Sequence, residues 1–459
     1  MVQKGGMSFD YTRRRHPGPE SPCSREEKVL EESEGVTTAM NRSKKTLAAL
    51  ILVLVMFPGT VAARDVTLTW LVHDHATMLD AWKGIIDSYR VENPNVTVEL
   101  TVVPGGAAYN ERMAVMAASG VLPDIIYLIN PSLIESGNIL ELTPLYDRDP
   151  EIPLLKSSWL PGVWEHSAHG EQRYMMPVAI AMQVAYLNTD HFSEGGIALP
   201  SDDWTWNEFL EVTKRLTRYG SQAVEQWGLE RPTASNLSGE VLPFVYEAGG
   251  RFFDDQYAPT QSYFTDEEVI EGLSFLHSLR WLHHVTPQPR EPNLTFINGG
   301  ASIRLHWPAR IAQFAQVPDL KWEIRRMPQY RERATVAGYD GLYINANTNH
   351  VDVAWDFVKY VTTSSAQSLY APHGQIPISR DVVLSAEWLN SPIPGLNKEA
   401  FSSEAAVAYN RQIRPKYDED INRIFAEEWR KAWETNEQAV ESVAAEVHRR
   451  VTALLQANQ

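Results

Sequence analysis

Strand and helix patterns alternate from residue 66 onward, and this alternation limits the fold more than any other feature of the chain. Residues 66–72 and 96–103 have the pattern of strands, and residues 124–129 form a continuous apolar strand. Between these strands, apolar residues recur at helical spacing over 78–89 and 109–116. Strands that alternate with helices predict right-handed crossovers and a mostly parallel sheet that is covered on both faces.

The rest of the chain changes character twice. Residues 174–190 form another long strand-like run, and a helix-rich region follows, in which Thr205 with Glu208 and Thr265 with Glu268 fit capping boxes. Strand patterns then return at ASIRLHW and GLYINA, and the chain ends in helical patterns. This order predicts an α/β fold of two lobes, each a mixed sheet flanked by helices, with a helix-rich second lobe.

Two strand crossings define the expected lobes. We expect these crossings at Pro177–Gln183 and Phe296–Ile303. The lobes then comprise residues 64–179 plus 303–346 (the first lobe) and residues 180–302 plus 347–459 (the second lobe). Ligands of such folds bind where strand ends of the two lobes face each other.

Residues 40–63 have the order of features of a secretory signal peptide. A basic flank precedes an apolar run over 47–57, and small residues follow up to Ala63. Because the run is too short for a membrane span, we expect a signal that is cleaved after Ala63. Residues 1–39, which are polar and charged, are then either a disordered leader or a stretch upstream of a translation start at Met40.

Cysteine usage and charge restrict the compartment and the partners. The only cysteine is Cys23, so residues 64–459 contain no disulfide and no cysteine at the expected cleavage point that could carry a lipid. We therefore expect a soluble periplasmic protein without a lipid anchor. The net charge is −17 for the chain and −19 for residues 64–459, because residues 1–63 carry nine basic and seven acidic side chains. This charge disfavours nucleic acid and anionic membranes as partners.

Eight segments follow one another in a recognisable order. They are SGVLPDIIYL, GNILELTPL, MMPVAIAMQVAYLNTDHF, WTWNEF, YEAGGRFFDD, FINGGASI, AWDFVKYVTTSSAQ and HGQIP. Together they resemble the extracellular solute-binding proteins of family 1, the sugar-binding subunits of ATP-driven (ABC) importers. The resemblance implies a type II periplasmic-binding-protein-like fold, in which a monomer closes two lobes on a sugar and presents the closed form to a membrane permease. It implies no catalysis, no cofactor and no metal.

The stretch FINGGASIRLHWPARI, residues 296–311, carries a further expectation from this resemblance. Phe296 and Gly299 match a family pattern that precedes a strand returning to the first lobe, and Trp307 stands near the place of an aromatic residue that faces the cleft. An indole ring offers a flat apolar face to a sugar ring. Carboxylate and amide side chains can hold adjacent hydroxyl groups, and an arginine donates hydrogen bonds in a fork.

The other candidates lie at strand ends or near the crossings. His73 and Asp74 follow the first strand, Asn130 follows the third, and Gln183 lies beside the first crossing. Residues 338–341 resemble the family's glycine-rich turn, which brings backbone amides to the ligand. The candidate ligand-binding residues are His73, Asp74, Asn130, Gln183, Glu240, Tyr246, Trp307, Tyr339, Asp340 and Arg380.

Other functions stay open at this point. An exported glycosidase would need two carboxylates across a cleft, and the sequence singles out no such pair; the serine-hydrolase pattern Gly-x-Ser-x-Gly is absent. The same fold could carry a polyamine, a phosphorylated polyol or a peptide. A strongly anionic cargo is disfavoured, because no glycine-rich loop with Lys or Arg marks an anion cradle. Residues 73–75 (HDH) lack the further ligands that a metal site needs.

Overall fold

A computed structural model describes residues 65–458, except 75–77, 238, 256–257, 374, 406 and 411–416. All described residues belong to one compact unit, Ala62–Gln459. The signal expected at 40–63, the preceding residues 1–39 and His75 lie outside the described residues.

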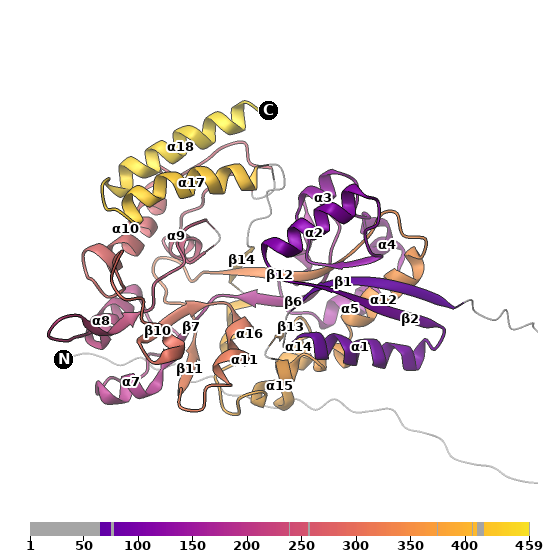
Figure 1. Ribbon diagram of the computed structural model, residues 1–459, viewed down its shortest axis with the longest axis horizontal. Coiled ribbons are helices and arrows are strands. Elements are labelled where there is room, and N and C mark those ends of the chain that lie inside the picture. The colour runs from indigo at the N-terminus through magenta and orange to yellow at the C-terminus, as the bar shows by residue number, and fades with distance from the viewer. Residues whose placement is uncertain are drawn as a thin grey trace, which may run out of the picture. The chain divides into compact units, whose positions relative to one another are not determined.

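The first sheet contains the strands that open the chain (Figure 1). Its strand order is β13-β6-β12-β3-β1-β2, and β14 pairs with β12. β1 is parallel to both β2 and β3, as expected, whereas β12 runs antiparallel to β3 and β6, so the sheet is mixed. Its strands are β1 (Val66–His73), β2 (Val96–Val103), β3 (Ile125–Tyr127), β6 (Met176–Met182), β12 (Thr335–Ile344), β13 (Ile376–Pro377) and β14 (Ala408–Asn410).

The second sheet has the strand order β11-β7-β10-β9-β8. β10 is antiparallel to β7 and parallel to β9. Its strands are β7 (Val184–Asn188), β8 (Arg218–Tyr219), β9 (Val224–Leu229), β10 (Ala301–His306) and β11 (Trp322–Arg325). A separate two-stranded hairpin is formed by β4 (Ala168–His169) and β5 (Gln172–Arg173).

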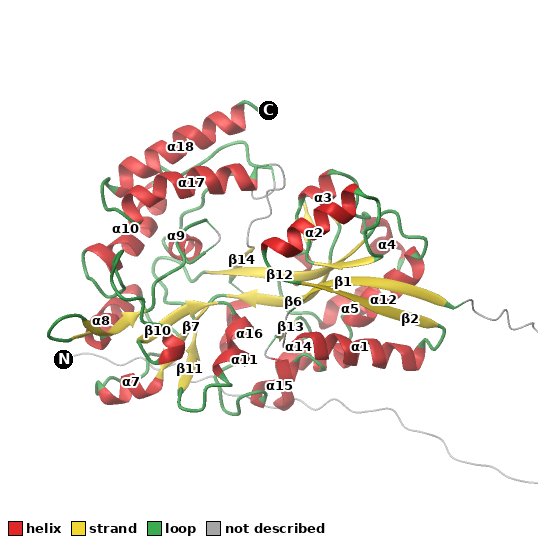
Figure 2. Ribbon diagram, in the orientation of Figure 1, coloured by secondary structure: helices red, strands yellow, loops and turns green. Residues whose placement is uncertain are grey.

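Helices surround both sheets, and Figure 2 shows their distribution. The α-helices are α1 (Met78–Glu92), α2 (Ala107–Ala118), α3 (Ser132–Glu135), α4 (Thr143–Arg148), α5 (Ile152–Ser158), α6 (Val163–His166), α7 (Thr189–Glu194), α8 (Trp206–Leu216), α9 (Val241–Glu247), α10 (Glu267–Trp281), α11 (Ile311–Phe314), α12 (Val351–Val361), α13 (Ser364–Ser368), α14 (Arg380–Val383), α15 (Ala386–Asn390), α16 (Glu399–Ala405), α17 (Asp418–Trp433) and α18 (Val440–Gln456). The 3-10 helices are η1 (Phe296–Asn298), η2 (Pro308–Arg310) and η3 (Ala371–His373).

Both faces of the first sheet are buried, as the alternation of strands and helices predicts. On one face, Trp70 of β1 is fully buried against Trp82 of α1 and Phe357 of α12, with ring centroids 5.7 and 5.5 Å apart. On the other face, Leu71 packs in a cluster with Met113 of α2. Aromatic pairs in such tilted arrangements add about 0.5–1.5 kcal/mol each to the burial of their area.

The two expected capping boxes have different outcomes. Thr205 and Glu208 form the box at the start of α8, because each side chain accepts a hydrogen bond from the other residue's backbone. At α10 the N-cap is Asp266 and not Thr265, and this cap makes no side-chain hydrogen bond among the described residues, so the box with Glu268 is wrong. The helix begins one residue later than expected, which breaks the spacing that the box requires.

The chain passes from the first sheet to the second through Gln183, which separates β6 from β7. This agrees with the first expected crossing. The return crossing differs from the expected one: Ile303 and Leu305 of β10 pair with Leu187 and Ala185 of β7, so β10 stays in the second sheet. The chain returns only after β11, over residues 326–334. The residue bounds of the two lobes stay a prediction.

Candidate functional site

A cluster of polar and aromatic side chains lies at the carboxyl ends of the parallel strands β1 and β3. The Tyr127 hydroxyl donates a 2.6 Å hydrogen bond to Asp340 Oδ2, and the His73 ring lies 5.4 Å from the Tyr127 ring. Tyr109 of α2 contacts the His73 ring and donates a hydrogen bond to the Tyr127 carbonyl. Burial, with the charge of Asp340 second, raises the pKa of Tyr127 well above its ordinary value. Tyr127 is therefore a neutral donor that orients the Asp340 carboxylate.

The candidates in the neighbouring loops are fixed by local hydrogen bonds. Asp74 Oδ1 accepts a 2.7 Å bond from the Gly105 backbone N–H, and Asn130 Oδ1 accepts a 3.0 Å bond from the Ser132 N–H. Asp74 is exposed and Asn130 is half-buried. Such bonds hold each side chain near the strand end and leave the second oxygen or the amide nitrogen of each group for other contacts.

Residues 338–341 form part of β12 and not the glycine-rich turn that the resemblance implies. The strand has a register shift between Asp340 and Gly341. A Cβ atom on Gly341 would lie 2.0 Å from Met175 Cγ, so this glycine allows Met175 to pack against the strand. Tyr339 is half-buried in β12, beside Asp340. Tyr339 and Asp340 stay in the strand because they pair with residues of β6 instead of turning away from it.

Three of the candidate residues are buried. Gln183 is fully buried; its Nε2 donates to the Gly239 carbonyl at 3.3 Å, and its Oε1 has no hydrogen-bond partner among the described residues. Glu240, directly before α9, is 5% exposed, and burial raises its pKa to about 8. Tyr246 lies buried within α9. Gln183 and Glu240 therefore lie close together beside the first crossing, because Gly239 directly precedes Glu240.

Trp307 and Arg380 belong to other elements of the fold than these groups. Trp307 follows β10, is half-buried against the core of the second sheet, and accepts a 3.1 Å bond on its carbonyl from the Tyr186 hydroxyl. Arg380 begins α14 and donates to the Trp159 carbonyl at 3.3 Å. It lines a pocket of about 380 Å³ whose described lining contains no other candidate. The structure therefore does not bring Arg380 together with the others.

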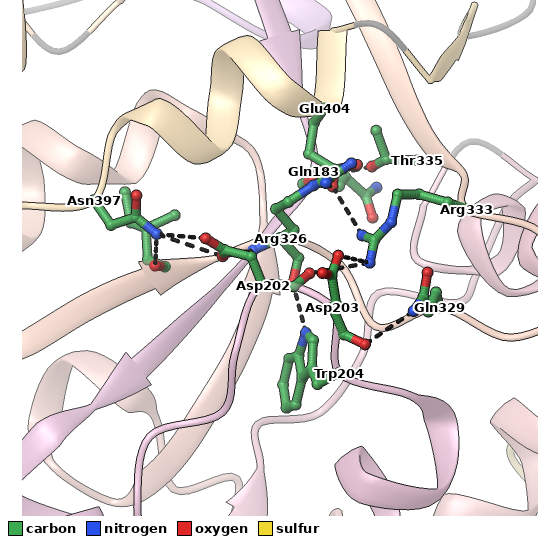
Figure 3. Close-up of polar contacts among 11 residues, drawn as sticks. Gln183, Asp202, Asp203, Trp204, Arg326, Gln329, Arg333, Thr335, Asn397 and Glu404 are labelled. Atoms are coloured by element: carbon green, nitrogen blue, oxygen red, sulfur yellow. Dashed lines mark hydrogen bonds and ion pairs between the residues drawn. The ribbon is translucent and has the colours of Figure 1, made fainter. Parts of the chain in front are cut away.

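An ionic network that the sequence did not indicate holds the return crossing in place (Figure 3). Arg326 donates to Glu404 Oε1, and Arg333 Nη1 lies 3.6 Å from the same oxygen. Arg333 also donates to Asp203 Oδ1 at 2.9 Å. Burial raises the pKa of Glu404 to about 7, although both arginines oppose this shift. The only sequence signal is the density of arginines over residues 325–333.

Gln183 of the first crossing is hydrogen-bonded to the start of β12, where the return crossing ends. The Thr335 hydroxyl donates to the Gln183 carbonyl at 2.9 Å, and the Gln183 N–H donates to the Val336 carbonyl at 3.1 Å. Glu404 belongs to α16, whose Phe401 packs in the core of the first sheet. The network therefore joins the connecting segments to a helix of the first core.

Sequence reasoning missed Tyr127, Tyr109 and Trp82 as neighbours of the candidate residues. Their helical and strand spacing is the spacing of core residues, which is what they also are. Among the described residues, no three His, Cys, Asp or Glu side chains are grouped as a metal site. Within the same residues, no helix combines the length and the apolar character needed to cross a membrane.

Comparisons with known proteins give consistent matches. An uncharacterized lipoprotein of Streptomyces antibioticus is 26% identical over 57% of this chain, and the match spans 56% of that protein's length. The multiple sugar-binding protein of Streptococcus mutans is 24% identical over 71% of this chain and 77% of its own length. An ABC substrate-binding protein of Listeria monocytogenes, solved with cycloalternan, has a TM-score of 0.73 at 18% identity and covers 85% of this chain and 99% of its own.

The solved structure shares the mixed α/β fold with two sheets, which confirms the expected fold class. The lipid anchor that the Streptomyces name indicates belongs to that relative, and its absence in this chain stays a prediction. The sequence profile of the bacterial extracellular solute-binding proteins matches residues 75–368, which is more than half of the chain. This protein therefore belongs to the family of bacterial extracellular solute-binding proteins.

Proposed function

We propose that this protein is an exported carrier that binds a sugar or oligosaccharide between two lobes and delivers it to the permease of an ABC importer. Membership of the solute-binding family supports this function, as does the name of the multiple sugar-binding protein of Streptococcus mutans. The observation that carries the proposal is the cluster of His73, Tyr127 and Asp340 at the carboxyl ends of β1 and β3. Oriented carboxylates and aromatic rings at a strand edge are the groups that hold sugar hydroxyls and ring faces.

Five of the candidates are sugar contacts in this proposal. Trp307 and Tyr339 stack on the sugar, whereas Asp74, Asn130 and Asp340 accept hydrogen bonds from its hydroxyl groups. Because the Tyr127 hydroxyl already fills one side of Asp340 Oδ2, the carboxylate keeps a fixed direction. A fixed acceptor loses little entropy on binding, which favours affinity.

Gln183 and the segment 326–334 serve as the hinge. Thr335 and Val336 bond to the Gln183 backbone, so both connections move as one unit. A sugar shifts the balance between open and closed forms only through the additional contacts that it makes in the closed form.

A carrier accounts for these features better than a hydrolase. Two of the proteins compared above, the Streptococcus relative and the solved Listeria structure, are named as sugar-binding and substrate-binding proteins, which supports binding without chemistry. The periplasm is the compartment that fits an exported carrier of this family.

A thermal-shift screen against neutral and charged sugars tests the proposal. A ligand that binds only the folded state raises the melting temperature by mass action, so at least one sugar should raise it in a concentration-dependent way. Asp340→Asn should reduce that shift, because an amide presents one acceptor where the carboxylate presents two. If polyamines, polyols and peptides shift the melting temperature while no sugar does, the cargo is misassigned.

A further inference from the structure

Two arginines of the stretch 296–311, Arg304 and Arg310, have no part in the proposed sugar contacts. Both line a cavity of about 210 Å³ at the carboxyl ends of β9 and β10. Glu230 follows β9 directly, and the pairing of Ile303 with Leu229 brings Arg304 beside Glu230. Charged side chains thus line this cavity, although the total charge of the chain is strongly negative.

The charges that line this cavity do not cancel. Arg304 forms an ion pair with Glu230 Oε1, and Glu230 Oε2 accepts a 2.7 Å bond from the Phe296 N–H, so both oxygens of this carboxylate are occupied. Arg310 forms no ion pair among the described residues; its Nη1 donates to Gln313 Oε1 at 2.7 Å. The described lining therefore carries two guanidinium groups against one carboxylate, a net charge of +1.

The neighbouring His306 adds no further charge to this balance. Burial, followed by the charge of Arg304, lowers the pKa of His306 to about 4, so this imidazole is neutral at neutral pH. Burial, followed by the charge of Arg310, lowers the pKa of Arg304 to about 10. The two guanidinium groups repel each other where burial reduces screening by water, so an anion that binds both groups stabilises them.

Two residues that line the cavity have polar atoms without a hydrogen-bond partner among the described residues. Arg304 Nε and Thr295 Oγ1 are buried and have no hydrogen-bond partner among the described residues. Both residues line the cavity. Buried donors without an acceptor are rare in folded proteins, and an acceptor supplied by a ligand or by water satisfies them.

We propose that this cavity binds the oxyanion group of an acidic sugar, a carboxylate or a phosphate. A guanidinium fork matches the paired oxygens of either group, and Thr295 adds a neutral donor. The proposal places the sugar ring on Trp307, the residue directly before η2, and the oxyanion at Arg310 of the same 3-10 helix. The sugar in this inference rests on the proposed function, whereas the oxyanion group rests on the cavity alone.

This assignment reverses the sequence expectation that an anionic cargo is disfavoured. That expectation assumed backbone amides of a glycine-rich loop as the anion donors. Here the donors are side chains of a strand, a 3-10 helix and the residue before another 3-10 helix, and no short motif marks that combination.

Calorimetric titration of the whole exported protein tests the inference. The ligands are a hexuronic acid disaccharide, a hexose phosphate, a neutral disaccharide of the same linkage, and inorganic phosphate. Arg310→Gln is the test variant, because Arg304 holds the buried Glu230 and its loss endangers folding. Arg90→Gln in α1 removes the same charge from an exposed site and is the matched control. We expect Arg310→Gln to weaken binding of an acidic sugar about tenfold or more, with the control unchanged, as for the loss of one charged hydrogen bond.

The outcomes separate this inference from the proposed function. Stronger binding of the hexuronate or of the hexose phosphate identifies which oxyanion is taken, and either result supports the site. Binding of neutral sugars alone, or equal losses in Arg310→Gln and Arg90→Gln, overturns the inference and leaves the proposed function standing. Binding of inorganic phosphate that depends on Arg310, with no sugar bound, removes the proposed function and keeps the anion site.

Discussion

Glu240 is a buried acid whose replacement should change how stability depends on pH. It is 5% exposed, its Oε2 has no hydrogen-bond partner among the described residues, and burial raises its pKa from 4.5 to about 8. Between these two values the native state binds a proton that the unfolded state has released. The free energy of unfolding should therefore fall as the pH rises from about 4.5 to 8.

The size of this effect follows from the shift. One pKa unit corresponds to about 1.4 kcal/mol, so a shift of this size contributes on the order of 4 kcal/mol of lost stability across that range. Glu240→Gln keeps the shape of the neutral acid and cannot ionise. The variant should match the wild type near pH 4.5 and be more stable by on the order of 4 kcal/mol above pH 8.

Urea denaturation followed by tryptophan fluorescence at several pH values measures this difference. Buried Glu404, whose pKa is raised to about 7, gives a slope of the same sign in both proteins, so the comparison isolates Glu240. Glu135→Gln on the exposed surface is the control and should leave the slope unchanged. Parallel stability curves for wild type and Glu240→Gln would refute the reasoning, because the carboxyl would then ionise equally in both states.

Further predictions concern binding, packing and processing. Trp307→Ala should weaken sugar binding by on the order of 1–3 kcal/mol with little change in melting temperature, measured by calorimetry and thermal unfolding; an unchanged affinity would assign the indole to the core. Gly341→Ala should destabilise the protein by on the order of 1–3 kcal/mol in urea, because its Cβ would lie 2.0 Å from Met175 Cγ. The control Gly84→Ala, whose Cβ would be in ordinary contact, should cost nothing, and equal losses would contradict the packing argument. N-terminal sequencing of exported protein should begin near residue 64; a start near Met1 would exclude the signal.

Patterns with a strict period predicted the first sheet well. Residues 66–72 and 96–103 become β1 and β2; β2, at the edge of the sheet, alternates buried and exposed residues at its start, whereas the second half of β1 is buried on both faces. The prediction of the return crossing was wrong, because periodicity does not show which strands pair. ASIRLHW has the strand pattern in either sheet, and only its pairing with β7 decides which sheet it joins. Periodicity reports which face is buried and not which neighbour covers it.

The candidate site was predictable where strand ends carry polar residues. His73 and Asp340 come together because β1, β3 and β12 are neighbours in one sheet. Tyr127 was hidden, because its spacing is that of a core strand while its hydroxyl serves Asp340. The cavity beside Arg304 depends on Glu230, which is 74 residues earlier in the chain. No local pattern reports a contact of that range.

The central claim is that the protein binds a sugar reversibly and does not alter it. Calorimetric titration with an oligosaccharide selected by thermal shift tests this directly. Mass spectrometry of the ligand recovered from the calorimeter cell then shows whether the ligand has changed. The account predicts saturation at one ligand per chain, recovery of the ligand with unchanged mass, and weaker binding by Asp340→Asn. Recovery of shorter products, or saturable binding of no sugar at all, would contradict it.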